Sequence, residues 1–194
     1  MPHINIKLYP GRPYELKKKL ADNVAKAVED TIGAKPSAIS VEIDEVPKEK
    51  WPKVYKNVIL ANEENLYKKP EYGYADEELN SDKYLEEGEV RAPKAQGGEG
   101  FIVKKDILPS GEIKDKCSLF SHMKLEPNSS IGYHKHTNES ETYYILSGEG
   151  EYNDNGVTRI VKAGDTTFTP NGFSHGLKNT KKCDLEFIAL IVRD

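Results

Sequence analysis

The chain has 194 residues, of which 37% are hydrophobic, and it carries a formal net charge of −4. This length and apolar content suffice for a packed core and permit one domain or two small ones. The negative charge argues against nucleic acid as a partner, and the longest apolar run, Phe187 to Val192, is too short to cross a membrane. With no signal-peptide pattern at the start and two widely separated cysteines, Cys117 and Cys183, we expect a cytoplasmic protein with free thiols.

The first fifty residues alternate between strand-like and helix-like patterns. Ile4, Ile6 and Leu8 alternate with polar residues, which predicts a half-buried strand. Apolar residues then recur at every fourth position, at Leu16, Leu20, Val24, Val28 and Ile32. They predict an amphipathic helix that ends at Gly33, and a second alternating run over 38–46 predicts another strand. The strand, helix and strand together predict a βαβ unit with two parallel strands. Because such a unit exposes sheet edges, we expect a homodimer or a larger homo-oligomer.

This N-terminal part resembles the 4-oxalocrotonate tautomerase family. The similar segments are Met1-Pro2-His3-Ile4, Pro10-Gly11-Arg12, Val41 to Pro47 leading to Trp51, and Tyr67 to Tyr72, which is similar to the tail of a longer, dimeric subgroup. In that family the initiator methionine is removed and the amine of the exposed proline is the general base. An arginine holds a substrate carboxylate and an aromatic residue walls the site. The resemblance therefore implies Pro2, Arg12 and Trp51 as catalytic residues.

The chemistry sets conditions on this implied site. Pro2 must be a neutral secondary amine to take a proton from carbon, which requires removal of Met1 and surroundings that lower the pKa of the amine. Arg12 would then steady the developing oxyanion. Ser40 stands where the type enzyme of the family has a second arginine, so a dicarboxylate substrate is not implied. If Met1 stays attached, the domain serves only for assembly.

The middle of the chain predicts a change of domain. A second helix is expected over 53–69, and the residues that follow are rich in charge, glycine, proline and alanine. We expect a tautomerase-like domain over 1–76, a charged linker over 77–97 and an all-β domain over 98–194. In that last part His122 lies on the opposite face from the apolar residues of its strand, so we do not expect it to be a ligand.

A group of metal-ligand side chains dominates the C-terminal part. His134 and His136 stand two residues apart in a strand-like run, which puts both rings on one face. The four polar residues 137–140 predict a hairpin turn, after which Glu141 begins another strand. His175 follows a segment punctuated by glycine and proline. Three imidazoles and one carboxylate suit Fe, Mn, Ni, Cu or Zn and do not suit Ca or Mg.

The two motifs around these residues, H-x-H-x4-E-x6-G and G-x5-P-x-G-x2-H-x3-N, resemble those of the cupin family. The resemblance covers roughly the C-terminal half of the chain. It implies a small antiparallel barrel, a double-stranded β-helix, with one divalent transition metal held by His134, His136, Glu141 and His175. Tyr143 and Phe168 are candidates to line the substrate site, and ordinary packing inside the barrel is the alternative for both.

Together these patterns predict an α+β protein in which a tautomerase-like unit precedes a cupin barrel. The expected function is that of a bifunctional, metal-dependent enzyme acting on a small oxygenated metabolite, of keto, enol or aromatic origin. An oxygenase, isomerase or decarboxylase activity fits the cupin site, and keto–enol tautomerisation fits Pro2. The alternative is a non-catalytic protein that binds a metal or small ligand, with the N-terminal part used for oligomerisation. The sequence identifies neither the metal nor the substrate.

Overall fold

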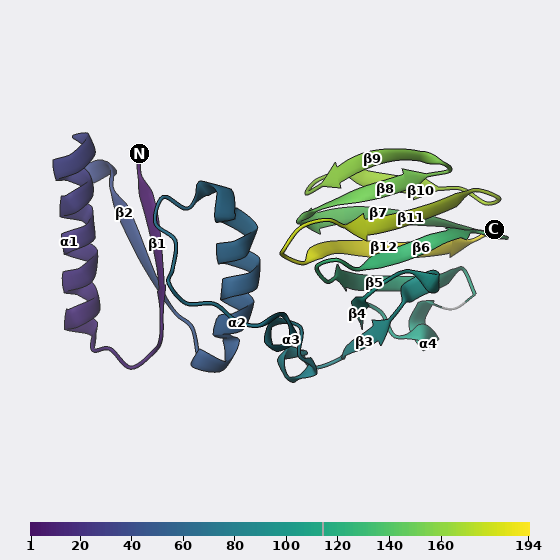
Figure 1. The fold of residues 1–194 in the computed structure, drawn as a ribbon, viewed down its shortest axis with the longest axis horizontal. Helices are drawn as coiled ribbons and strands as arrows, with labels where there is room; N and C mark the ends of the chain where they lie inside the picture. Colours follow the sequence, from purple (N-terminus) through teal and green to yellow (C-terminus); the bar gives the residue numbers. More distant parts are fainter. Residues whose placement is uncertain (114) are drawn as a thin grey trace. The chain divides into compact units, whose positions relative to one another are not determined.

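The computed structural model describes residues 1–113 and 115–194 and divides them into two compact units, Met1–Trp51 and Pro52–Asp194 (Figure 1). The first is an α/β unit and the second is dominated by antiparallel strands, as predicted for this α+β chain. Within these described ranges, no helix has both the length and the apolar character needed to span a membrane.

The N-terminal unit is the predicted βαβ arrangement. Its elements are β1 (His3–Leu8), α1 (Tyr14–Ile32), η1 (Pro36–Ala38), β2 (Ser40–Glu45) and η2 (Lys48–Lys50). The strands β1 and β2 pair in parallel, with Ile4 opposite Val41 and Ile6 opposite Ile43. Gly33 ends α1 in the left-handed conformation, at φ 69°, which glycine adopts without steric cost.

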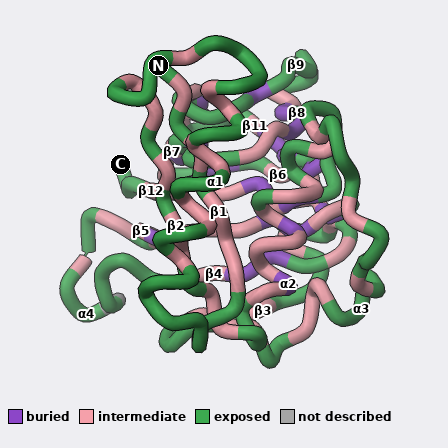
Figure 2. The backbone as a smooth tube through the Cα atoms, turned by 90° about the vertical axis from the view of Figure 1, so that its left-hand side faces the viewer, coloured by how far each residue is buried: buried purple, intermediate pink, exposed green. Residues whose placement is uncertain are grey.

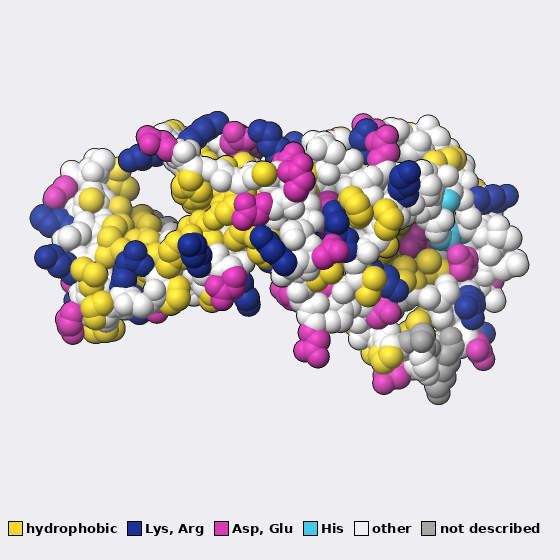
Figure 3. Space-filling view, turned by 60° about the horizontal axis from the view of Figure 1, so that its bottom comes forward, with side chains coloured by type: hydrophobic (Ala, Val, Ile, Leu, Met, Phe, Trp, Pro, Cys, Tyr) yellow, Lys and Arg dark blue, Asp and Glu magenta, His cyan; other side chains and the backbone are white. Residues whose placement is uncertain are grey.

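The core of this unit is incomplete within one chain. Every residue of Met1–Trp51 is at least partly exposed to solvent, and the tube of this unit is pink and green without purple segments (Figure 2). Apolar side chains lie on its surface (Figure 3), and Tyr14, Leu16 and Ile32 are largely exposed. Burial of apolar surface is the main driving force for folding, so the unit gains stability if another surface covers these side chains.

The C-terminal unit consists of two antiparallel sheets. The order in the larger sheet is β10-β7-β12-β5-β4-β3, and in the smaller one it is β6-β11-β8-β9. Their bounds are β3 (Glu89–Pro93), β4 (Phe101–Asp106), β5 (Cys117–Leu125), β6 (Ser130–Lys135), β7 (Glu139–Ser147), β8 (Glu149–Asp154), β9 (Val157–Lys162), β10 (Thr166–Thr169), β11 (Ser174–Asn179) and β12 (Leu185–Arg193). The sheets form the two layers of a jelly-roll and do not close into one continuous barrel.

Side chains from both sheets form one hydrophobic core between the layers. The larger sheet contributes Ile102, Leu125, Tyr143, Ile145, Phe187 and Ala189, with Leu185 at the start of β12, and the smaller one contributes Ile131, Tyr152, Val161 and Leu177. The purple segments of the tube run along these strands (Figure 2). Alternate residues of each strand face inward, as the period of two requires.

The connection over 137–140 does not form the predicted hairpin. The strand before it, β6, belongs to the four-stranded sheet, whereas the strand after it, β7, belongs to the six-stranded sheet. The same is true of β10 and β11, on either side of the turn at Pro170 and Gly172. Short polar connections are compatible with either arrangement, and here the need to cover both apolar faces sends the chain from one sheet to the other.

The region over 51–97 differs from its prediction, because short helical turns stand in place of the single helix expected over 53–69, and the expected linker over 77–97 contains ordered elements. It contains α2 (Trp51–Val54), the π-helical turn η3 (Tyr55–Ile59), η4 (Leu60–Asn65), α3 (Asp76–Leu79) and η5 (Asp82–Tyr84). Buried Lys56 forms an ion pair with Asp184 and donates a 2.8 Å hydrogen bond to Asn80. The chain therefore divides after Trp51, before the predicted boundary at 76, and the predicted linker over 77–97 contains β3, which pairs with β4. Two further short elements are η6 (Ala95–Gly97) and α4 (Ser110–Ile113).

Phe187 tests this description of the core. Its side chain is fully buried, so Phe187→Ala should lower the free energy of unfolding of the C-terminal unit by about 3–5 kcal/mol. Phe168→Ala is the matched control, because that ring is 58% exposed, and it should cost less than about 1 kcal/mol. Denaturant unfolding followed by near-ultraviolet circular dichroism measures both, and equal losses would contradict the assignment of the two faces.

Candidate metal centre

The crossing of the chain between the sheets brings the four predicted ligands together. His134 on β6 pairs directly with His175 on β11, so their side chains lie side by side on one face of the smaller sheet. Glu141 lies on β7 in the larger sheet. His136 follows the end of β6, where its backbone N–H donates to Phe173 at 3.0 Å and its carbonyl accepts from Gly172 at 2.9 Å. These bonds tie the connection after β6 to the turn before β11.

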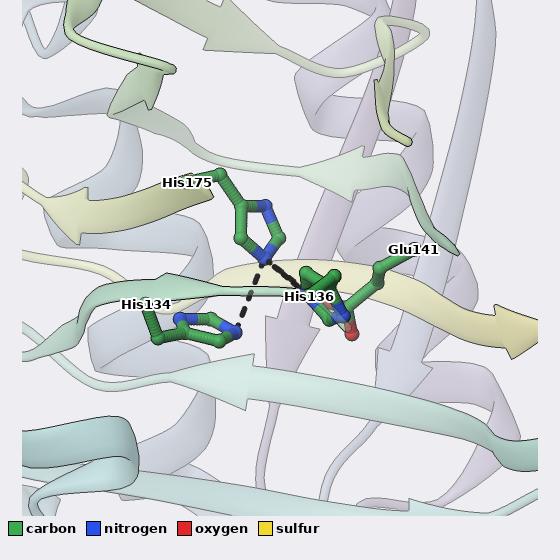
Figure 4. Close-up of side chains that lie close together, drawn as sticks. All are labelled: His134, His136, Glu141 and His175. Carbon is green, nitrogen blue, oxygen red and sulfur yellow. Dashed lines mark hydrogen bonds and ion pairs between the residues drawn. The ribbon is translucent and has the colours of Figure 1, made fainter. Parts of the chain in front are cut away.

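The side chains of these residues converge on one point (Figure 4). The Nε2 atom of His175 lies 3.1 Å from Nε2 of His136 and 3.3 Å from Nε2 of His134. The Glu141 Oε2 atom lies 2.8 Å from Nε2 of His175 and 3.2 Å from Nε2 of His136. All four candidate ligand atoms lie within 4.8 Å of one another. His136, Glu141 and His175 are buried, and His134 is partly exposed.

These separations fit a shared metal ion. At a bond length of about 2.1 Å, neighbouring ligand atoms lie about 3.0 Å apart around an octahedral ion and about 3.4 Å apart around a tetrahedral one. The four separations given above, 2.8 to 3.3 Å, are of this size. The cluster therefore indicates a metal site, and its nitrogen-rich donor set suits a divalent transition metal.

The outward nitrogen of each histidine contacts a different group. His134 Nδ1 lies 2.8 Å from the carbonyl oxygen of Gly132, and His136 Nδ1 lies 3.1 Å from Oε1 of Glu139. His175 Nδ1 lies 3.0 Å from the hydroxyl of Tyr152, which also contacts Thr169 Oγ1 at 2.7 Å. Such contacts fix ring orientation and leave the Nε2 atoms directed at the centre.

Gly132 has a steric role at the start of this motif. A Cβ atom at this position would lie 2.2 Å from the backbone oxygen of Gln96, which belongs to η6. Any side chain would therefore push η6 away from β6. The close approach of the two backbones holds the Gly132 carbonyl where it meets the His134 ring.

The charges of the cluster are strongly coupled. Burial alone would raise the pKa of the Glu141 carboxyl, but hydrogen bonds with His136 and His175 outweigh it and lower the pKa to about 2. The hydrogen bond with Glu141 raises the pKa of His136, whereas burial lowers the pKa of His134. Glu141 is thus an anion at neutral pH and His134 a neutral imidazole, the forms in which carboxylates and histidines bind metals.

The two predicted lining residues have different positions. Tyr143 is buried and stacks on the His175 ring, with ring centroids 5.1 Å apart. Burial raises the pKa of its phenol, so it stays protonated. Phe168 does not reach the cluster side of the sheet, because its neighbours Thr167 and Thr169 take the buried positions of β10 while Phe168 is exposed. The prediction for Phe168 is therefore wrong, since the sequence did not reveal which face of this strand is buried.

The predicted tautomerase residues do not meet within one chain. Pro2 precedes β1, whereas Arg12 follows it, and a six-residue strand is about 20 Å long. The Arg12 guanidinium donates to the Tyr9 carbonyl at 2.7 Å, and the Trp51 ring packs edge-on against Tyr9 at 5.0 Å. Arg12 and Trp51 thus gather at one end of the strand, with Pro2 at the other.

Two residues beside the cluster were missed by the sequence analysis. Glu139 was treated as part of a polar turn, although its spacing of three from His136 was a usable signal. Tyr152 stands on β8, far from the other residues in sequence, and had no such signal. His122 lies outside the cluster and contacts Glu186 at 3.0 Å, in keeping with its expected exclusion.

The fold and the site define a class: a two-layer β-protein with a histidine and glutamate cluster between its sheets, preceded by a parallel βαβ unit. Comparison with protein families finds a cupin domain over residues 121–191 and a tautomerase enzyme domain over 2–52. The chain belongs to the cupin family through its C-terminal unit and to the tautomerase family through its N-terminal unit.

Different relatives match the two parts of the chain. An oxalate-binding protein of Thermotoga maritima is 46% identical over 102 residues, which are 53% of this chain and 84% of that protein. A crystal structure from the same organism, described as a predicted oxalate decarboxylase, matches with a TM-score of 0.53 and 44% identity, over 55% of this chain and 92% of that one. A probable tautomerase of Xylella fastidiosa is 42% identical over 74 residues, which are 38% of this chain and 90% of that protein.

The lowered pKa of Glu141 predicts an effect on acid stability in the metal-free protein. A carboxyl group with a pKa of 4.5 when unfolded and about 2 when folded stabilises the fold fully above pH 4.5, and this contribution is lost as the pH falls towards 2. Glu141→Gln removes this contribution. Between pH 4.5 and pH 2 the free energy of unfolding of the variant should therefore fall by less than that of the wild type, and the difference should reach about 3 kcal/mol. Denaturant unfolding at each pH measures it. Glu149→Gln changes a half-buried carboxylate that pairs with Lys181 outside the cluster, and it should follow the wild type; parallel curves for Glu141→Gln would contradict the prediction.

Proposed function

We propose that the C-terminal unit binds one divalent transition metal through His134, His136, Glu141 and His175, and uses it to hold a small oxygenated carboxylate. The observation that carries the proposal is the convergence of three Nε2 atoms and one carboxylate oxygen at separations of 2.8 to 3.3 Å. Oxalate is the first compound to test, because a 46% identical relative is described as an oxalate-binding protein.

The residues around the proposed metal site have different roles. The three histidines and Glu141 supply four ligand atoms, which leaves positions on a six-coordinate ion for substrate or water. When bound, the metal supplies Lewis-acid polarisation of a substrate oxygen. Tyr143, protonated and stacked on His175, closes one side of the cluster against water, and partly exposed His134 marks the open side.

Turnover is a further part of the proposal, in the oxygenase, isomerase or decarboxylase class. The polar side chains next to the cluster are already hydrogen-bonded to its histidines, since Glu139 contacts Nδ1 of His136 and Tyr152 contacts Nδ1 of His175. Proton transfer to a substrate therefore has to come from other groups or from water. The non-catalytic alternative, a protein that binds a metal and a small ligand, is separated from it by an assay for product.

His134→Ala tests the metal-dependent site. The variant lacks one of the four proposed ligands. After dialysis its metal content should therefore be at least about 10-fold lower than that of the wild type, and it should no longer bind oxalate. His122→Ala is the matched control, because it removes a histidine of the same unit that lies outside the cluster. Elemental analysis and calorimetric titration of oxalate, keto acids and catechols measure both effects.

Three outcomes decide among the readings. Oxalate binding that is equally strong in metal-free protein would contradict the proposed role of the metal. Metal-dependent binding with product formation supports an enzyme. Full metal occupancy and ligand binding without any product would instead favour the non-catalytic binding protein over the enzyme.

We also propose a tautomerase activity at Pro2, which rests on the tautomerase match over residues 2–52. The amine of Pro2 takes a proton from carbon once Met1 has been removed, and Arg12 binds the carboxylate or oxyanion of the substrate. Because Pro2 and Arg12 stand at opposite ends of β1, we propose that a second copy of the chain completes the site. Covering the exposed apolar side chains of the N-terminal unit favours the same homo-oligomer.

Pro2→Ala tests this second activity. Loss of the cyclic amine should lower kcat/KM for ketonisation of an enol such as phenylenolpyruvate by about 100-fold or more. Pro109→Ala, in the C-terminal unit, should leave the rate unchanged, and intact mass spectrometry should find a chain that begins at Pro2. Retention of Met1 on all chains would contradict the proposal, and a fully active monomer in sedimentation experiments would contradict the shared site.

A further inference from the structure

The groups behind the three histidines are not equivalent. The His134 ring faces a neutral carbonyl and the His175 ring faces a neutral hydroxyl, whereas the His136 ring faces the carboxylate of Glu139. Glu139 is held on its other side, where its Oε2 atom accepts a 3.1 Å hydrogen bond from the hydroxyl of Ser118 on β5. One imidazole of the cluster therefore has a fixed negative charge behind it.

We propose that Glu139 is a positioning residue of the metal centre, which holds the Nδ1–H of His136 so that the Nε2 lone pair faces the ion. The inference rests on the proposed function of the cluster as a metal site. A carboxylate can only accept a hydrogen bond, so Glu139 accepts the Nδ1–H of His136 and Glu141 accepts from Nε2 in the metal-free protein; when a metal takes the place of the Nε2 proton, the remaining proton of His136 lies on Nδ1. The opposite tautomer would place a proton on Nε2, where the metal binds.

The contacts distinguish this role from that of the other two groups. The Gly132 carbonyl also only accepts, and it fixes the His134 tautomer without adding charge. The Tyr152 hydroxyl both donates and accepts, and its contact with Thr169 leaves either direction open, so it does not fix the His175 tautomer. Glu139 alone of these three combines a fixed tautomer with a charge.

The negative charge of Glu139 changes the net charge around the proposed metal ion. Three neutral imidazoles and the Glu141 carboxylate leave a divalent ion with a net charge of about +1. The Glu139 carboxylate, 28% exposed and one imidazole away from the ion, brings the local sum near zero and makes His136 the strongest donor among the three rings. Removal of this charge should weaken the bond from His136 and leave the other two unchanged.

Glu139→Gln removes the negative charge and the fixed acceptor behind His136 while keeping the size of the side chain. The glutamine keeps the length of the side chain, but its amide can turn so that the NH2 group donates to Nδ1 while the amide oxygen accepts from the Ser118 hydroxyl. We expect Co2+ to bind about 10–100-fold more weakly, as measured by competition with a chromophoric chelator. Glu149→Gln is the control of equal charge change, in a partly exposed ion pair with Lys181, and should bind Co2+ like the wild type.

Spectroscopy of the Cu2+ form tests the positioning role directly. The quadrupole coupling of the remote Nδ1 nitrogen in pulsed electron paramagnetic resonance reports the hydrogen bond that this atom donates, and one of the three couplings should change in Glu139→Gln. Ser118→Ala keeps the carboxylate and removes its second anchor, so it should weaken Co2+ binding by a smaller factor. Unchanged affinity and unchanged couplings in both variants would overturn the inference while the proposed function stands. Failure of the wild type to bind Co2+ or Cu2+ would overturn the proposed function and the inference with it.

Discussion

The burial of the Glu141 carboxylate among three imidazoles is the interaction on which the C-terminal unit depends. A charge in the interior of a protein is costly unless it is paired and hydrogen-bonded. Here the Nε2 atoms of His136 and His175 lie at 3.2 and 2.8 Å from one carboxylate oxygen and lower the pKa of the group to about 2. The same arrangement that solves this electrostatic problem brings together four side chains that could hold a metal ion.

The two-layer architecture supplies what the cluster needs. Glu141 comes from one sheet and His134 and His175 from the other, so the donors face each other across the sandwich. The hydrophobic core fills the space beside them and keeps water from three of the four side chains. Behind the rings, Gly132, Glu139 and Tyr152 hold the outward nitrogens. Neighbours that hold the rings in this way would lower the entropy cost of binding at the proposed metal site.

The N-terminal unit presents the opposite situation. Its strands, helix and turn are all formed, yet none of its residues is buried and its predicted catalytic groups are separated by the length of β1. Both facts agree with the proposed homo-oligomer, in which a second copy of the chain would cover the exposed apolar side chains and bring its own groups to the site. Completing its core and completing its site then become the same event.

Local pattern alone determined much of this protein. The βαβ unit, the end of α1 at Gly33, the strands that carry the ligands and the four ligand residues themselves follow from periodicity and from two short motifs, because period and spacing are properties of neighbouring residues. Only the tertiary structure decided which sheet each strand joins, and so showed that 137–140 is a crossing and that Phe168 faces outward. It also placed Tyr152 behind His175 and Lys56 against Asp184. These contacts join segments that are not neighbours in the chain, and they form only when the sheets and the helical turns pack together, which no local pattern encodes.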